Sequence, residues 1–178
     1  MSIEPFIDNI YRIHKAATLE RTQRNIVLIQ NALFNKRNET KLMNKNDQNL
    51  AAQGLAMNKE RHYDKDANNK YLVETILLDD IIAYLPKQND GSEFKTAIMK
   101  IDIEGFEAFA LQKASKLFDR LDIKIIFMEW DHLLANSERD INEMISFLTV
   151  RGYKPCLHGA ALELDDFLNW PSDISWMR

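Results

Sequence analysis

The sequence is poor in cysteine, proline and glycine, and it has no long hydrophobic run. Its one cysteine, Cys156, cannot form an internal disulfide, so nothing indicates a secreted, disulfide-stabilised fold. No apolar stretch approaches the roughly 20 residues that a membrane-spanning helix needs. The start, MSIEPFIDNIYR, has neither the basic segment nor the apolar core of a signal peptide. We therefore expect a cytoplasmic protein that does not associate with a membrane.

Basic and acidic residues are nearly balanced. There are 23 Lys and Arg against 27 Asp and Glu, and the net charge of −4 argues against nucleic acid as a general partner. Hydrophobic residues make up 46% and charged residues 28%, which is the composition of a folded globular protein. A chain of 178 residues suffices for one ordinary core, so we expect a single domain over residues 1–178.

Apolar runs of strand length alternate with helical patterns along most of the chain. The sequence predicts strands at 25–33, 71–77, 97–103, 124–130, 153–157 and 160–164. It predicts helices after Pro5, over 78–86, after Gly105, and from Ser137 to a stop at Gly152. Because the strands are continuous apolar runs rather than alternating ones, we expect an α/β domain with a parallel sheet covered on both faces.

One long stretch interrupts this alternation. Residues 35–70 are dense in Asn, Lys, Asp and Gln, and they predict a polar loop with a short strand at 39–43. Loops of this length inside a compact domain are uncommon and often functional. We therefore treat 35–70 as an insertion into the domain.

The run TAIMKIDIEGFE, residues 96–107, ends an apolar strand in three acids around one glycine. Asp102 and Glu104 are two residues apart and would share a face if the strand continued, whereas Gly105 permits a sharp turn. Glu107 falls in the first turn of the next helix, where the helix dipole favours an acid. Asp102 has two open interpretations, a cap of that helix or part of a site. Ligands of parallel α/β sheets bind beyond the carboxyl ends of the strands, so a site is expected here.

The next strand end repeats the pattern with Glu129, Asp131 and His132. Histidine titrates near neutrality, so His132 could be a general base or a metal ligand; an exposed loop histidine is the alternative. Together with Asp102 and Glu104, these residues could form a divalent-metal cluster, as in a metal-dependent hydrolase. Their spacing matches no recognised ligand pattern, so we assign no metal site.

Several segments resemble the FkbM-type family of S-adenosylmethionine-dependent methyltransferases. They are LDD at 78–80, MKIDIEGFE at 99–107, the strand that ends in Glu129, and shorter matches at 3–5, 31–33 and 170–176. The likeness runs over nearly the whole chain. It implies a class I methyltransferase (Rossmann-like) fold with a mostly parallel sheet and helices on both faces. It also implies O-methylation of a hydroxyl group on a small molecule or sugar.

The resemblance implies a set of residues that bind S-adenosylmethionine. Glu4 would hold the ribose hydroxyls, because a carboxylate can accept two hydrogen bonds from a vicinal diol. Asn31 and Ala32 would lie near the adenine. Asp102 would border the methyl donor and the acceptor hydroxyl.

The resemblance also implies the catalytic candidates, which are Asp102, Glu104 and Glu129. Methyl transfer is an in-line displacement, so the enzyme needs alignment and a group that accepts the hydroxyl proton. Asp102 or Glu129 could serve as that base, and the sequence leaves the choice open.

One feature of the family has no counterpart in the sequence. Its first strand and glycine-rich turn should precede Glu4, but only three residues do so. The five glycines stand at positions 54, 91, 105, 152 and 159, and none forms a G-x-G run. We therefore expect a family domain that is incomplete at its N-terminus. The alternative to an enzyme is a non-catalytic remnant that serves as an interaction module.

Overall fold

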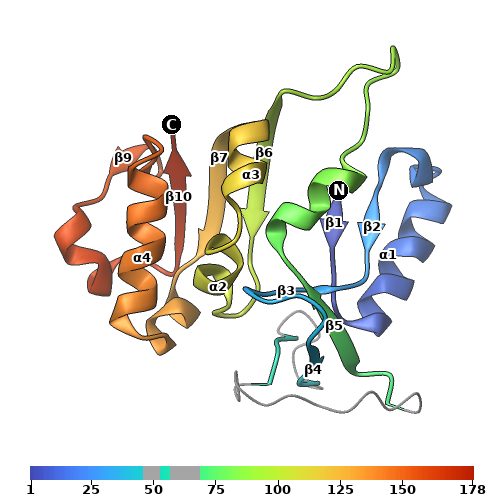
Figure 1. Ribbon diagram of the computed structural model, residues 1–178, viewed down its shortest axis with the longest axis horizontal. Coiled ribbons are helices and arrows are strands. Elements are labelled where there is room, and N and C mark those ends of the chain that lie inside the picture. Colours follow the sequence, from blue (N-terminus) through green and yellow to red (C-terminus); the bar gives the residue numbers. More distant parts are fainter. Residues whose placement is uncertain (46–52, 57–68) are drawn as a thin grey trace. The chain divides into compact units, whose positions relative to one another are not determined.

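The computed structural model describes residues 1–45, 53–56 and 69–178, and the chain divides into two compact units, Met1–Glu93 and Phe94–Arg178 (Figure 1). Residues 46–52 and 57–68 of the predicted loop lie outside the described residues. The expectation of a single domain over the whole chain stays a prediction. No helix in the described ranges is both long enough and apolar enough to cross a bilayer.

The first unit contains two small sheets. In one, β1 (Ser2–Ile3) pairs in parallel with β2 (Leu28–Ile29). In the other, β5 (Leu72–Ile76) lies between β3 (Ala32–Leu33), parallel to it, and β4 (Thr40–Leu42), antiparallel to it. The predicted strand at 25–33 is therefore two short strands in different sheets, while the strands predicted at 39–43 and 71–77 are confirmed.

The helical elements of the first unit follow the predicted order. Helix α1 (Ile7–Leu19) begins just after Pro5, and a short 3₁₀ helix, η1 (Gln23–Asn25), precedes β2. The predicted helix at 78–86 is a 3₁₀ helix, η2 (Leu78–Tyr84), whose start is capped by Asp80: its carboxylate accepts the Leu77 N–H at 3.0 Å.

The second unit is built on one mixed sheet. Its strands lie in the order β6 (Thr96–Ile101), β7 (Asp122–Glu129), β10 (Asp173–Met177), β8 (Lys154–Leu157) and β9 (Ala160–Ala161). The β6–β7 pair is parallel, but β10 runs antiparallel to both of its neighbours and β9 is antiparallel to β8. The expectation of a mostly parallel sheet is therefore wrong.

The position of β10 explains why the sheet contains antiparallel pairs. Ile174 and Trp176 alternate with polar positions along it and are 4% and 0% exposed, so one side of the strand is buried in the core. This segment returns to the sheet and enters between β7 and β8, in the direction opposite to both. Because antiparallel pairing needs no crossover helix, the last strand of the chain can close the sheet without one.

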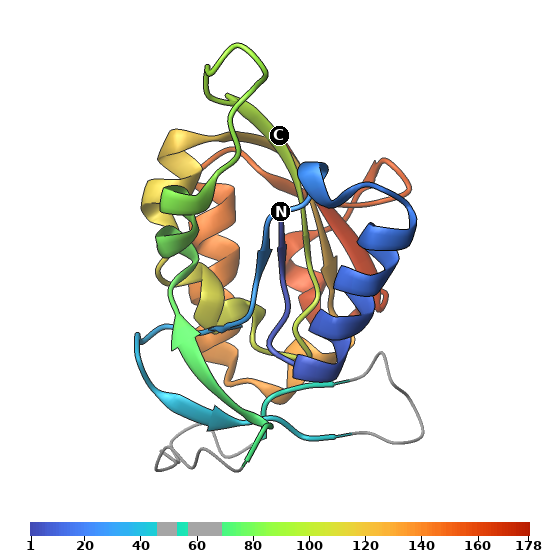
Figure 2. The ribbon, with the colours of Figure 1, turned by 90° about the vertical axis from the view of Figure 1, so that its right-hand side faces the viewer.

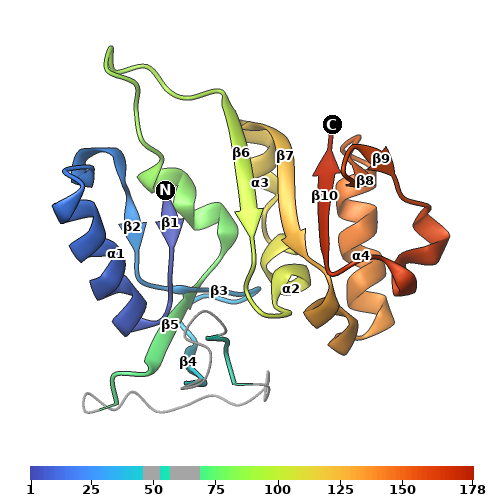
Figure 3. The same ribbon diagram turned by 180° about the vertical axis from the view of Figure 1, so that it is seen from behind.

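Three helices of the second unit lie on one side of its strands. They are α2 (Glu107–Leu111), α3 (Ser115–Arg120) and α4 (Glu138–Thr149), and they stand behind β6, β7 and β10 in Figure 3; the view turned by 90° in Figure 2 agrees. Within this unit, helices therefore cover one face of the sheet rather than both.

The helices of this unit bury the residues that the sequence pattern indicates. Helix α4 begins after Ser137, whose hydroxyl accepts the Asp140 N–H at 3.2 Å. The predicted helix after Gly105 is two short helices, but its apolar positions are all in the core: Ala110, Ala114, Leu117, Phe118 and Leu121.

Candidate functional site

The turn that follows β6 determines where its acids lie. The strand ends at Ile101, and Glu104 and Gly105 have φ angles of +57° and +89°, in the left-handed region. This conformation costs about 1 kcal/mol for a residue with a side chain, so the surroundings must stabilise it at Glu104. Because the strand stops before Asp102, the two acids do not extend one strand face. The Asp102 carboxylate instead accepts from Lys100 Nζ at 2.8 Å.

The neighbouring strand ends at the same edge of the sheet. In the parallel register Ile101 lies opposite Met128, so β7 ends with Glu129 beside the turn after β6. The next residue, Trp130, is fully buried; its indole N–H donates to the Phe167 carbonyl at 2.7 Å. Trp130 thus anchors the start of the 3₁₀ helix η3 (Asp131–Ala135), which carries His132.

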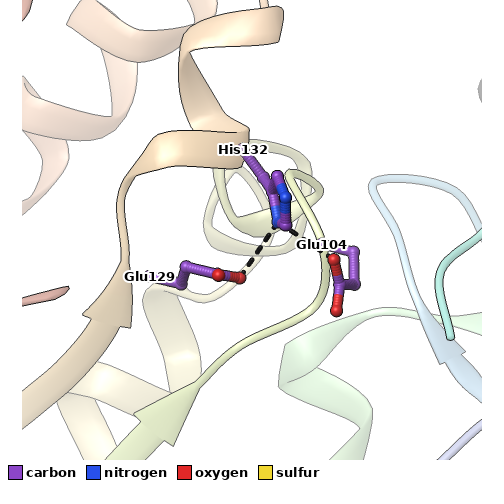
Figure 4. A group of neighbouring side chains, drawn as sticks. All are labelled: Glu104, Glu129 and His132. Carbon is purple, nitrogen blue, oxygen red and sulfur yellow. Dashed lines mark hydrogen bonds and ion pairs between the residues drawn. The ribbon is translucent and has the colours of Figure 1, made fainter. Parts of the chain in front are cut away.

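Two carboxylates meet on one imidazole nitrogen in this unit. His132 Nδ1 lies 2.9 Å from Glu104 Oε2 and 3.1 Å from Glu129 Oε2 (Figure 4). The glutamate side chains are 21% and 27% exposed, and the histidine is 50% exposed. Since ionised carboxylates only accept hydrogen bonds, we assign the proton to Nδ1. Within the described residues, Nε2 forms no hydrogen bond.

The backbone holds these side chains in place through Gly105. The Asn136 amide donates to the Gly105 carbonyl at 2.7 Å, and so ties the turn after β6 to the segment after β7. A Cβ atom at Gly105 would lie only 2.7 Å from the His132 carbonyl oxygen. Glycine is therefore required here by the close contact as well as by its positive φ.

Glu107 has a larger role than the sequence indicated. Its side chain is fully buried and turns back so that Oε1 accepts the Ile103 N–H at 2.8 Å, while Oε2 has no partner among the described residues. Burial, assisted by the charges of Asp102 and Glu129, raises the pKa of Glu107 to about 7. The carboxyl group thus stabilises the turn from inside the unit instead of facing solvent at a helix start.

Burial and the neighbouring charges of this site change the pKa values of Glu129 and His132. Burial raises the pKa of Glu129, and the charges of Asp102 and Glu104 raise it further against the opposing effect of His132. Partial burial lowers the pKa of His132, but the charges of Glu129 and Glu104 and the hydrogen bond to Glu129 outweigh this effect and raise it above its ordinary value.

Three of the four residues predicted to bind the cofactor, Glu4, Asn31 and Ala32, lie in the first unit, and the fourth, Asp102, follows β6 in the second. Glu4 follows β1 directly, its N–H donates to the Ile29 carbonyl at 3.0 Å, and Asn31 comes two residues after β2. Glu4 and Asn31 therefore leave the carboxyl end of the same parallel pair. The Asn31 amide donates to the Glu74 carbonyl at 3.0 Å, and Ala32 is only 2% exposed in β3.

Glu4 fits a diol ligand on its own geometry. Its Oε1 accepts the Phe6 N–H at 2.7 Å and its Oε2 accepts from the Asn9 amide at 3.3 Å. A carboxylate offers about four acceptor positions, so two bonds within the protein leave acceptor capacity for a pair of hydroxyls. The residue is half-buried, which fixes the carboxylate while keeping it accessible.

The proposed metal cluster is only partly assembled. Within the described part of the chain, Glu104, Glu129 and His132 bring one ligand atom each to within 4.8 Å of one another, whereas Asp102 and Asp131 do not join them. A hydrogen-bonded imidazole accounts for the two short distances without an ion.

Acids and a histidine at the carboxyl ends of parallel strands define an α/β protein with a polar site where such folds bind ligands. The family model of the methyltransferase FkbM domain matches residues 1–155. The chain therefore belongs to the FkbM methyltransferase family. Neither the comparison with curated proteins nor that with solved structures gives a match.

Proposed function

We propose that the chain is an S-adenosylmethionine-dependent methyltransferase that methylates a hydroxyl group on a small molecule or sugar. The observation that carries the proposal is the group of Glu104, Glu129 and His132 at the strand ends of a member of this family. A hydroxyl oxygen loses its proton when it is methylated, and this group offers proton acceptors at neutral pH. S-adenosylmethionine would supply the methyl group from a positively charged sulfur.

The residues proposed to bind the cofactor are those that the family resemblance implies, Glu4, Asn31, Ala32 and Asp102. In the first unit, Glu4 holds the ribose hydroxyls, with Asn31 and Ala32 near the adenine; the remaining acceptor capacity of Glu4 supports this role. In the second unit, Asp102 borders the methyl donor. Its carboxylate lies at the exit of β6, where negative charge favours a cation.

Calorimetric titration of the full chain with S-adenosylmethionine tests this proposal. We expect saturable binding, and the same titration with Mg²⁺ or Mn²⁺ alone should give none. Binding of metal alone would support a metal-dependent hydrolase. The absence of binding with every ligand would support a non-catalytic interaction module.

A matched pair of variants makes the titration specific. Glu4→Gln removes the charge of the proposed ribose ligand but keeps one acceptor oxygen for the Phe6 N–H. Glu143→Gln makes the same chemical change on the exposed side of α4, where Glu143 pairs with Arg139. Weaker binding by the first variant alone supports the assignment of Glu4.

A further inference from the structure

We propose that His132 is the catalytic base of the methyl transfer and that Glu104 and Glu129 act through it as positioning residues. This inference rests on the proposed function, and it gives the proton-accepting role to the imidazole instead of Asp102 or Glu129. It is carried by the two contacts of 2.9 and 3.1 Å that converge on His132 Nδ1.

The two glutamate contacts at Nδ1 determine which ring nitrogen of His132 can accept a proton. Both glutamates contact Nδ1, so the hydrogen of a neutral ring stays there and the lone pair is on Nε2. In Figure 4 the dashed lines from Glu129 and from Glu104 meet at one atom of the ring. Half of the His132 side chain is exposed, so an acceptor hydroxyl can reach the ring.

The carboxylates themselves are less suited to the task. One oxygen of each is already directed at the imidazole: Glu129 Oε2 accepts a hydrogen bond from Nδ1 at 3.1 Å, and Glu104 Oε2 lies 2.9 Å from the same nitrogen. A general base works best when its pKa lies near the operating pH, which histidine provides. When the imidazole takes up a proton, it becomes a cation between two anions, and this arrangement stabilises the protonated form.

The surrounding backbone keeps the imidazole in position before any ligand binds. The Asn136–Gly105 hydrogen bond joins the two turns, and Glu107 holds the Ile103 N–H immediately before Glu104. Trp130 is buried two residues before His132. Such support is needed because a catalytic group must be held within a fraction of an ångström of its productive position.

The step balances with the methyl donor of the proposed function. The acceptor O–H bond breaks and its proton goes to His132 Nε2. A lone pair of that oxygen forms the bond to the methyl carbon, while the electrons of the carbon–sulfur bond remain on sulfur. The imidazolium then releases its proton to water, because the side chain is half exposed.

The charged groups around the ring determine its pH response. Glu104 and Glu129 contact it, Glu107 lies behind the turn, and Asp102 forms an ion pair with Lys100 at the exit of β6. If His132 is the base, the rate rises with pH through a midpoint above the ordinary histidine value of about 6.5. A carboxylate base with an ordinary pKa would already be active below pH 6.

Nitrogen-detected NMR of the histidine rings in the full chain tests the inference without a known acceptor. His132→Asn assigns the signal. We expect the neutral ring to carry its hydrogen on Nδ1, and we expect its pKa to fall in Glu104→Gln and Glu129→Gln but not in Glu143→Gln. A hydrogen on Nε2, or a pKa that none of the glutamine variants changes, would overturn the proposal.

Binding measurements separate this inference from the proposed function. Calorimetry with S-adenosylmethionine should give the same affinity for the wild type and His132→Asn, because the histidine is not assigned to the cofactor. If the wild type does not bind, the methyltransferase proposal fails whatever the NMR shows. Mn²⁺ binding that is lost in His132→Asn would assign the group to a metal instead and overturn the role of His132 as base.

Discussion

Replacement of Glu107 by glutamine should change how stability depends on pH. Burial raises the pKa of Glu107 from 4.5 to about 7, a difference of about 2.5 units. Each unit corresponds to about 1.4 kcal/mol, so ionisation of this buried carboxyl should cost about 3 kcal/mol. Since the folded pKa lies above the unfolded one, the folded state keeps the proton longer. Stability is therefore lost as pH rises from about 4.5 to 7.

The glutamine variant isolates this effect. Its amide oxygen can still accept the Ile103 N–H, but it cannot ionise. The amide also brings two donors to a place where Oε2 has no partner among the described residues, at a cost of about 1–3 kcal/mol that does not vary with pH. The diagnostic quantity is therefore the change with pH in the stability difference between wild type and variant.

Urea unfolding at pH 5 and pH 8 measures that quantity. We expect Glu107→Gln to gain about 2–3 kcal/mol relative to the wild type between the two values, slightly less than the full effect because the unfolded carboxyl is already mostly ionised at pH 5. His132 also has a raised pKa, and its contribution is lost as pH rises through the same range. Most of that contribution cancels in the comparison, because the charge of Glu107 is the smallest of the causes that raise the pKa of His132. Glu143→Gln should show no such gain. A difference between wild type and Glu107→Gln that stays constant with pH would refute a buried, proton-retaining carboxyl at this position.

Three further substitutions test the site. Gly105→Ala should lower the melting temperature and shift the NMR signals of the His132 ring, because the new Cβ would lie 2.7 Å from the His132 carbonyl oxygen. The control Gly159→Ala, at a glycine with a similar φ and open space around it, should lower the free energy of unfolding by only about 1 kcal/mol. Equal losses in the two variants would contradict the close contact at Gly105. Glu4→Gln should weaken S-adenosylmethionine binding about tenfold in calorimetry, since hydrogen bonds to charged groups contribute about 1.5 kcal/mol or more; unchanged affinity would remove Glu4 from the ribose site. Asp102→Asn should reduce methyl transfer, measured as S-adenosylhomocysteine release, much more than it lowers the urea midpoint; parallel losses would indicate a structural role.

The elements around the site could be predicted because their patterns are local. The apolar runs of β6 and β7 were visible in sequence, as were the Ser137 cap and the left-handed Gly152 of α4. The direction of the sheet could not be predicted, because it depends on a distant pairing: residues 173–177 enter between β7 and β8. No short window of sequence specifies such a partner.

The site was predictable in composition but not in geometry. The acids after β6 and β7 were identified from their place at strand ends, but the approach of Glu104 to His132 depends on a left-handed backbone that a glutamate seldom adopts. The burial of Glu107 was missed because a glutamate in a first helical turn normally faces solvent. Its spacing of four residues from Ile103, across the turn, was the available signal.

Methyl transfer itself is the most direct test of the account. The full chain would be incubated with S-adenosylmethionine that carries an isotopically labelled methyl group and with a panel of sugars and phenols, and the products analysed by mass spectrometry. We expect the labelled methyl group on a hydroxyl oxygen with the wild type and about 100-fold less of it with His132→Asn, at unchanged cofactor affinity. Equal labelling by both proteins would contradict the role of His132, and no labelling despite cofactor binding would contradict hydroxyl methylation.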